Sequence, residues 1–261
     1  MKKTLIALVV ASSAVSGSAM AAGWEENGSG SSVELGGTLT LTTMETPWEV
    51  KTGNAVTDLN AQIQKGQRVV NISTNKSIPV LGIRTKQNTA FNGQQGITPQ
   101  IDYQGKVTFS ESSNWGESLV NLDIFDNSSN KIGSLETTLS VAAVYSYSKA
   151  NEKSHGGMAA VKSGDAFWGG LSNFSKALGF DDAVYILNRI STEYLEKYNQ
   201  QDSTNSKGKS LDFADTDATY SAAYGAGILQ GRQIKLTLDQ AAVGNESIAW
   251  KASLPVTVTY M

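Results

Sequence analysis

The sequence predicts an all-β protein, a β-sandwich that carries a helical insertion. Most of the chain alternates short segments rich in β-branched and aromatic residues with turns rich in Gly, Asn, Asp and Ser, the pattern of a sandwich. One stretch, residues 172–198, instead repeats its apolar residues every three or four positions, as an amphipathic helix does. These two observations predict one β domain that helices interrupt once.

Residues 1–21 have the three parts of a secretory signal peptide. Lys2 and Lys3 form a positive region, Leu5–Val10 begins an apolar region, and Ala19–Ala21 supplies a small-x-small cleavage site. The apolar region is too short, and too interrupted by Ser and Gly, to span a bilayer. We expect export, with residues 22–261 as the mature protein.

The composition argues against nucleic acid as a partner and against disulfides. The chain has 24 Asp and Glu against 21 Lys and Arg, two of which lie in the leader, so the mature protein is acidic. Phosphate binding needs a clustered cationic face, and the sequence has none. There is also no cysteine, although the exported compartment permits disulfides. Stability must then come from core packing, strand pairing and assembly.

Seven segments carry the predicted strands. Each holds β-branched or aromatic residues with some alternation, and turn residues bound it. Three prolines, at positions 79, 99 and 255, fall at strand starts, edges or turns, where a missing N–H is tolerated. The predicted strands are Arg68–Ser73, Val80–Thr85, Lys106–Ser110, Leu119–Phe125, Ser134–Val144, Arg232–Leu238 and Leu254–Tyr260.

Two helices are predicted within residues 172–198. We expect the first to end at Gly179 and the second to be capped by Asp181 or Asp182. The insertion as a whole, residues 148–210, is expected to form a helical and loop subdomain. The apolar residues with helical spacing are Phe174, Leu178, Leu187, Ile190, Tyr194 and Tyr198.

Residues 22–42 form an N-terminal arm with no local partner. Val33, Leu35, Leu39 and Leu41 alternate with polar or small residues, which is the pattern of a strand with one buried face. A flexible Gly/Ser run precedes them, and the residues that follow do not form a hairpin partner. Two glycines in the arm, at positions 36 and 37, would let two backbones approach closely. The arm therefore pairs at a distance, either as an ordinary edge strand of this chain or on another molecule.

The last predicted strand repeats this alternation. Leu254, Val256, Val258 and Tyr260 share one face, with threonines on the other. A sandwich whose last strand ends the polypeptide can lack the strand that covers its neighbour, which leaves a groove of unpaired backbone and apolar pockets. An arm with alternate apolar side chains has the shape that fills such a groove on another molecule.

The sequence resembles the chaperone–usher fimbrial subunits of enterobacteria, of the Fae/Clp (FaeG-like) type. The likeness covers essentially the whole chain, and the order and spacing of its motifs are more specific than any one of them. The absence of cysteine also fits this subgroup. The matching motifs are the leader MKKTLIAL, the arm VELGGTLT, Trp48–Gly53 (WEVKTG), Asn75–Lys86, Ile97–Gly105, Lys131–Leu135, Ser221–Gly231 and the penultimate Tyr260.

The resemblance implies an incomplete immunoglobulin-like sandwich over residues 43–261, without its seventh strand. In such families a periplasmic chaperone lends a strand, an outer-membrane usher exchanges it, and the arm of the neighbouring subunit replaces it. The expected product is a homopolymer, exported through the periplasm to the cell-surface fimbrium. The donor strand would be Val33, Leu35, Gly37, Leu39 and Leu41, and the groove strand Leu254, Val256, Val258 and Tyr260.

The sequence indicates no catalytic or metal-binding site. His155 is the single histidine and there is no thiol, which excludes a metal site built from several imidazoles or thiolates. Asp212, Asp215 and Asp217 lack the Gly and Glu of a calcium loop. Gly225–Gly231 (GAGILQG) lacks the Lys-Ser/Thr of a phosphate loop, so we interpret it as a bend between strands. We expect no enzyme activity, no metal and no cofactor.

A candidate site for a host glycoconjugate lies in the insertion. Trp168 lies near Asp165, with Lys162 upstream and Lys176 downstream, and a flat aromatic ring with converging polar groups is the minimum for binding a sugar. The competing interpretation is that the aromatic residues pack the insertion onto the sandwich, and we prefer it for Phe167 and Phe174.

Two other classes of protein remain open. Alternating strands, a leader and a C-terminal aromatic residue also suit a small outer-membrane β-barrel, although few strands reach membrane-spanning length. A freely secreted lectin would instead be a soluble monomer that folds without a chaperone. Whether a fimbrial subunit lies in the shaft or at the tip is not encoded in these features, because both would carry the same arm and groove.

Overall fold

Residues 44–261 form the body of the protein, and residues 1–43 form a separate unit. The computed structural model describes residues 36–38, 45–109, 116–172 and 177–261. The arm residues Val33, Leu35, Leu39 and Leu41 thus lie outside the described residues.

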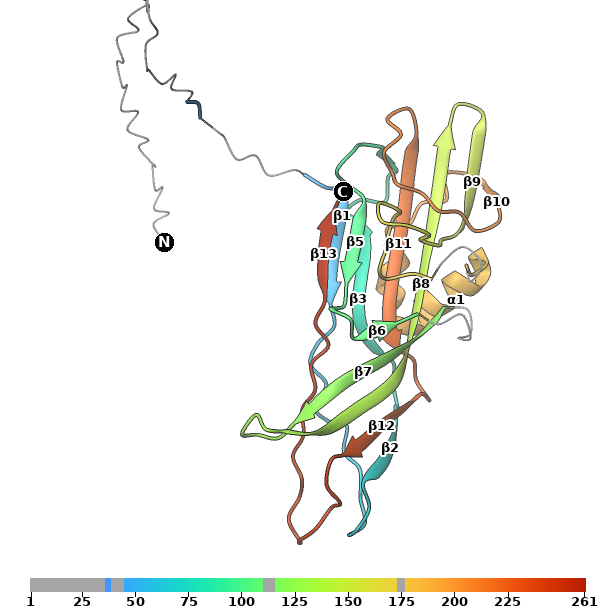
Figure 1. The fold of residues 1–261 in the computed structure, drawn as a ribbon. Helices are drawn as coiled ribbons and strands as arrows, with labels where there is room; N and C mark the ends of the chain where they lie inside the picture. The colour runs from blue at the N-terminus through green and yellow to red at the C-terminus, as the bar shows by residue number, and fades with distance from the viewer. Residues whose placement is uncertain (1–35, 39–44, 110–115, 173–176) are drawn as a thin grey trace, which may run out of the picture. The chain divides into compact units, whose positions relative to one another are not determined.

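The long strand β8 (Lys131–Lys149) organises the larger sheet. β11 (Thr219–Ile228) pairs with the second half of β8, and β12 (Gln233–Leu238) pairs with the first half, so the two act as one interrupted strand. β3 (Ile78–Thr85) pairs with β11, and β2 (Val69–Ser73) pairs with β12. All these pairings are antiparallel, so the continuous strand β8 lies beside the interrupted strand β11–β12, and β3 and β2 pair along the far side of that interrupted strand (Figure 1).

Shorter elements complete this sheet. β1 (Trp48–Thr52) pairs with β3 and ends the row on that side. On the other side of β8, β7 (Glu117–Phe125) pairs with its first half and β9 (Glu152–Gly157) with its second. The remaining short strands are β4 (Phe91–Asn92), β6 (Val107–Thr108) and β10 (Thr204–Asn205), which pair with β11, β7 and β9.

A second, two-stranded sheet contains the end of the chain. β13 (Thr257–Tyr260) pairs antiparallel with β5 (Pro99–Asp102). The other edge of β5 is taken by the loop at Trp168, which forms a parallel bridge with Gln100. The main hydrophobic core draws buried residues from both sheets, among them Leu81, Ile101 and Tyr224. The fold is therefore the predicted all-β sandwich.

The helical part of the insertion covers the outer face of the larger sheet. α1 (Phe180–Ile190) and the 3-10 turn η2 (Thr192–Leu195) bury Leu187, Ile190 and Tyr194 against β8 and β11 in a second core. The close approach of η2 to β11 depends on Gly225, because a Cβ there would lie 2.6 Å from Cδ2 of Tyr194.

Several expectations for this region need correction. Residues 177–179 are not helical, and 173–176, which include Phe174, lie outside the described residues, so the first predicted helix is not found in the described part of the chain. The second helix is α1, but Gly179 is its N-cap, while Asp181 and Asp182 lie in the first turn, where they favour the helix dipole. The helix ends at Ile190 rather than continuing to residue 198.

Most predicted strands are confirmed, with changes in length. The segment predicted at Ser134–Val144 is longer, as β8, because residues on both sides of it also find ladder partners. Only Val107–Thr108 of the third segment and Thr257–Tyr260 of the last form ladders. The expected bend at Gly225–Gly231 is wrong for its first half: residues 225–228 belong to β11, and the turn follows them.

Candidate functional site

Among the described residues, β13 has a ladder partner on one side only. Thr98 and Met261 exchange both backbone hydrogen bonds, each at 3.1 Å. Farther down the same segment, Phe125 and Lys251 also exchange both bonds, each at 2.9 Å. In an antiparallel ladder such pairs recur at every second residue, so the odd-numbered residues of this segment face β5 and β7.

The even-numbered residues therefore turn their backbone groups away from β5. These are Leu254, Val256, Val258 and Tyr260, and no described residue pairs with their N–H or C=O groups. Pro255 is odd-numbered, so its missing N–H removes no donor from this open edge. The edge from residue 252 to residue 260 thus keeps all of its donors free for another strand.

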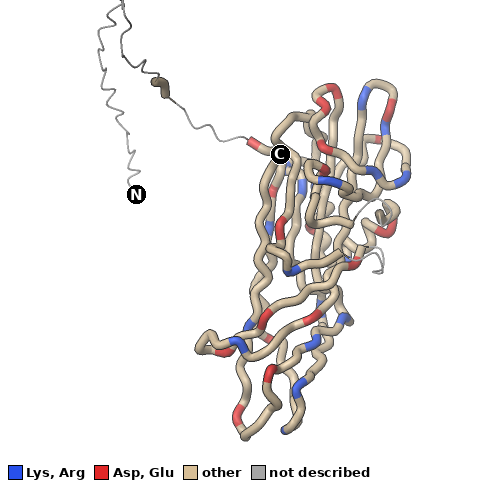
Figure 2. The backbone as a smooth tube through the Cα atoms, viewed as in Figure 1, with Lys and Arg blue, Asp and Glu red and all other residues tan. Residues whose placement is uncertain are grey.

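Apolar side chains line this edge. Ala252, Leu254, Val256 and Val258 are half-buried and pack against the main core, and Tyr260 is exposed. The segment after Lys251 carries no charged side chain (Figure 2). The four residues predicted as a groove strand are therefore apolar on one face and unpaired at one backbone edge.

A second open edge begins at β1. The bonds from Lys86 N to Pro47 O and from Gly53 N to Val80 O join β1 to β3, so the residues between them at even positions turn their backbone groups away. Val50 is one of them. Its side chain shares the core-facing side with buried Trp48, yet it is 42% exposed, because nothing in the described residues covers that side.

The same edge continues beyond β1 without any ladder. From residue 54 to residue 63 no described residue of another strand bonds to the backbone. Val56, Leu59 and Ile63 are nevertheless half-buried. Next to them lies a pocket of about 100 Å³, lined on its apolar side by Val56, Leu59, Ile72 and Ile78.

The two open edges are held side by side at both ends. At one end, Gly66 donates to Ala242 and Ala242 donates to Gln67, both at 2.8 Å. At the other end, Trp48 Nε1 donates to the carbonyl of Ile97 at 2.6 Å, next to the Thr98–Met261 pair. Figure 1 shows the blue segment after β1 and the red segment before β13 running alongside each other. We call the region between residues 48–63 and 252–260 the open seam.

A strand laid in the open seam could pair on both of its sides. Backbone groups would bond to the two edges, and alternate side chains would meet the apolar face, the arrangement by which proteins bind an added β-strand. The arrangement offers no catalytic group.

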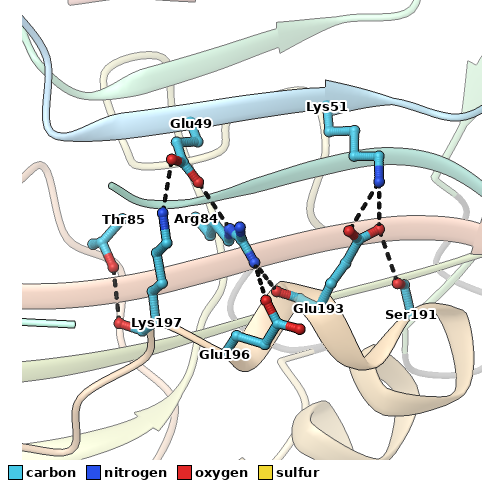
Figure 3. Close-up of polar contacts among 8 residues, drawn as sticks. All are labelled: Glu49, Lys51, Arg84, Thr85, Ser191, Glu193, Glu196 and Lys197. Carbon is cyan, nitrogen blue, oxygen red and sulfur yellow. Dashed lines mark hydrogen bonds and ion pairs between the residues drawn. The ribbon is translucent and has the colours of Figure 1, made fainter. Parts of the chain in front are cut away.

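An ion-pair network fixes the other face of β1 (Figure 3). Glu49 bonds to Lys197 Nζ at 2.7 Å and to Arg84 Nε at 3.0 Å, and Lys51 bonds to Glu193 at 2.9 Å. The ammonium of Lys197, and then Arg84, lower the pKa of Glu49, as Lys51 lowers that of Glu193. The network holds β1 to η2, which matters because, in the part of the chain that the structure describes, β1 has a ladder on one side only.

Of the predicted donor residues the structure describes Gly37 alone. It is exposed and has no regular secondary structure, and a Cβ at this position would meet no atom within 4 Å. The pairing of Val33, Leu35, Leu39 and Leu41 remains a prediction from the sequence.

Three of the candidate glycan residues, Lys162, Asp165 and Trp168, lie in one loop of the described chain. Asp165 is buried, and its Oδ2 accepts bonds from the backbone N–H groups of Val161 and Lys162 at 2.7 and 2.9 Å, so this carboxylate shapes the loop. Trp168 is 37% exposed and Lys162 is exposed, while Lys176 lies outside the described residues. Phe167 is buried and stacks on Tyr224 at 5.3 Å, as the packing interpretation expects.

The sequence interpretation missed the second edge of the open seam. Val56, Leu59 and Ile63 are spaced three and four apart within a polar stretch, so period-two alternation did not reveal them. The only signal for this edge was that Val56, Leu59 and Ile63 are isolated apolar residues between WEVKT and the next strand. The segment that holds them is too polar for a core strand.

In the described residues, the other side chains considered for catalysis or metal binding make structural contacts. His155 is buried, its Nδ1 lies 3.0 Å from Ser203 Oγ, and its ring lies against Phe180. Among the described residues no group of three or more His, Asp or Glu side chains could hold a metal ion. No helix in the same residues is long and apolar enough to cross a membrane.

Fold and site together define a β-sandwich protein with an edge open to strand addition. The family model "Fimbrial, major and minor subunit" matches residues 1–261, and the chain belongs to this family. It is a structural subunit of surface fimbriae, in a family that is not known to be enzymatic.

Three relatives illustrate the likeness. The chain is 28% identical to K88 fimbrial protein AB, 29% to K88 fimbrial protein AC and 27% to F41 fimbrial protein, all from Escherichia coli. Each comparison covers 100% of this chain and 100% of the relative.

Proposed function

We propose that this subunit polymerises by donor-strand exchange, in which its arm fills the open seam of the neighbouring copy. The observation that carries the proposal is the pair of edges, residues 48–63 and 252–260, whose outward-turned backbone groups have no partner among the described residues. The donor is the arm around Val33–Leu41, which alternates in the same period of two.

The arm must run antiparallel to β13 of its acceptor. Each arm joins its own body at Pro47, at the end of the seam where Met261 lies. If the arm ran parallel to β13, its C-terminal end would emerge from the acceptor at the Met261 end of the seam. The acceptor's own arm already departs from that end. An antiparallel arm leaves at the opposite end, near Gln67 and Ala242, so that subunits connect head to tail.

The apolar residues of the arm can hold such a contact. Burying Val33, Leu35, Leu39 and Leu41 contributes roughly 1.5–3 kcal/mol for each side chain, as an upper bound, before the ordering cost of the arm. The backbone bonds to both edges add to this. Gly36 and Gly37 would let the backbone of the arm approach another backbone closely, where a side chain would collide.

An unfilled seam requires protection before assembly. Half-buried Leu254, Val256 and Val258 and exposed Val50 would present apolar surface and free backbone to other chains. A periplasmic chaperone would cover them with a strand of its own, and an outer-membrane usher would exchange that strand for the arm. This sequence of partners follows from the resemblance together with the open edges.

Adhesion to a host glycoconjugate is a second proposed function, favoured by the exposure of Trp168 on a loop that Asp165 holds in place. Trp168 would stack on a sugar, with Lys162 beside it. Glycan-array binding by polymers of Trp168→Ala measures this directly. Binding equal to that of the parent polymer would remove Trp168 from the proposal.

Periplasmic expression of three forms tests the assembly proposal. The forms are the parent alone, the parent with its cognate chaperone, and a self-complemented variant in which residues 27–42 follow Met261 through a short linker. A short linker suffices because the transplanted arm would turn at Met261 and run back antiparallel to β13. We expect soluble monomer only from the chaperone complex and from the self-complemented variant. A stable monomer of the parent alone would mean that the seam needs no added strand.

A further inference from the structure

We infer that successive subunits also touch directly, through two surfaces at opposite ends of the open seam that each expose apolar side chains. The lower surface is the loop of residues 239–249, and the upper surface is formed by Val161 and Met261 of the next subunit. The partner is thus a second copy of this chain. The inference rests on the proposed strand exchange and adds to it a contact between the folded bodies.

Chain length forces the two ends together. The last apolar residue of the arm is Leu41, and β1 of the same chain begins at Trp48. Leu41 and Trp48 are seven residues apart along the chain, so their Cα atoms lie at most about 25 Å apart. The arm leaves its acceptor near Gln67 and Ala242 of the acceptor. The short connection from Leu41 to Trp48 therefore keeps the donor's Trp48 close to that end of the acceptor.

The lower surface is exposed and carries two large apolar side chains among polar ones, including Asp239 and Glu246. Val243 is 80% exposed, and Ile248 in the same loop is also exposed. The loop follows β12 and is fastened to the 64–67 turn by the Ala242 bonds and by the contact of Lys65 Nζ with Asn245. It therefore lies at the end of the seam where the arm of the next subunit emerges.

The upper surface lies beside β13. Gln100 fixes its loop, because its amide nitrogen donates to Asp165 O at 2.9 Å and its carbonyl accepts from Gly164 N at 3.1 Å. Ser163 Oγ lies 3.7 Å from the sulfur of Met261, which brings the loop to the end of the chain. Val161 and Met261 are 51% and 58% exposed on this surface.

The chemistry of the two surfaces matches. Each exposes a few apolar side chains, too few to hold two free molecules together. An arm already seated in the seam keeps the two patches at high effective concentration, so that a weak contact forms inside the polymer. The contact would limit bending between subunits rather than drive assembly.

The absence of cysteine allows a direct test. Polymers carrying Val243→Cys together with Val161→Cys are treated with a short bis-maleimide and boiled in detergent to dissociate the strands. We expect a ladder of covalent dimers, trimers and longer species. The matched control pairs Val243→Cys with Tyr185→Cys, which is exposed on α1, on the outer face of the other sheet, and we expect it to give monomers only.

The outcomes separate this contact from strand exchange. Polymer formation is scored first, without cross-linker, for the parent and for both double variants. Polymers that form normally but give no ladder with the Val243–Val161 pair would overturn the contact and leave strand exchange standing. Absence of polymers in the parent would overturn both. Equal ladders from both cysteine pairs would also contradict the contact, because the cross-links would then come from random collisions and not from a fixed position of one subunit against the next.

Discussion

Val258→Pro is expected to weaken acceptance of the arm while leaving the β13–β5 ladder intact. The N–H of Val258 points to the open seam, because Thr98 and Met261 set the alternation of the ladder. Proline removes that donor, and an arm carbonyl then stays unpaired in the filled seam. Leaving a buried acceptor unpaired costs about 1–3 kcal/mol. The affinity for the arm should therefore fall by roughly 5- to 150-fold.

The measurement is uptake of a synthetic peptide with the sequence of residues 27–42 by the chaperone-bound subunit. Thr259→Pro is the matched control, because the N–H of this neighbouring residue bonds to β5 and not to the seam. It should instead lower the stability of the body. If Val258→Pro and Thr259→Pro changed peptide uptake and stability alike, the assignment of even-numbered residues to the open edge would be wrong.

Gly225→Val is expected to destabilise the body by roughly 3 kcal/mol or more, because it overpacks the contact between α1 and the sheet. A Cβ at Gly225 would lie 2.6 Å from Cδ2 of Tyr194 and 2.7 Å from Cδ2 of Leu187. Both side chains are buried, and burial also raises the pKa of Tyr194 to about 12. Neither has space to move away, so the helix would be displaced from β11.

Urea unfolding of the self-complemented variant, followed by tryptophan fluorescence, measures this change. Gly179→Ser is the matched control at the start of α1, where an added Cβ would meet no atom closer than 3.7 Å. Serine is as good an N-cap as glycine or better, so stability should stay within a few tenths of a kcal/mol. Equal stability of Gly225→Val and the parent would show that α1 does not depend on this close approach.

The sequence predicted features that depend on local patterns. Strands with clear alternation, such as β7 and β12, were found because one face of each is buried and the other is not. The alternation from Leu254 to Tyr260 also predicted an apolar face. That alternation did not reveal which backbone edge is open, because the edge is set by partners distant in the sequence, Thr98 and Phe125.

Other features lay beyond local patterns. Residues 54–63 have neither period-two alternation nor, among the described residues, a ladder partner, so no local pattern marked them as an edge. The small residues of β11 were interpreted as a bend, although they make room for Tyr194 and Leu187. Asp165 was chosen for its charge near Trp168, but charge alone does not distinguish a ligand-facing carboxylate from one that accepts backbone bonds within its own loop.

Amide hydrogen exchange on the self-complemented variant tests the open seam most directly. The amides of Thr257, Thr259 and Met261, which face β5, serve as internal standards. If the arm fills the seam, the amides of Val256, Val258 and Tyr260 should exchange as slowly as these standards, because the arm accepts their bonds. Fast exchange at the even-numbered residues beside slow exchange at the odd-numbered ones would mean that no strand pairs with this edge, and would contradict strand exchange in this subunit.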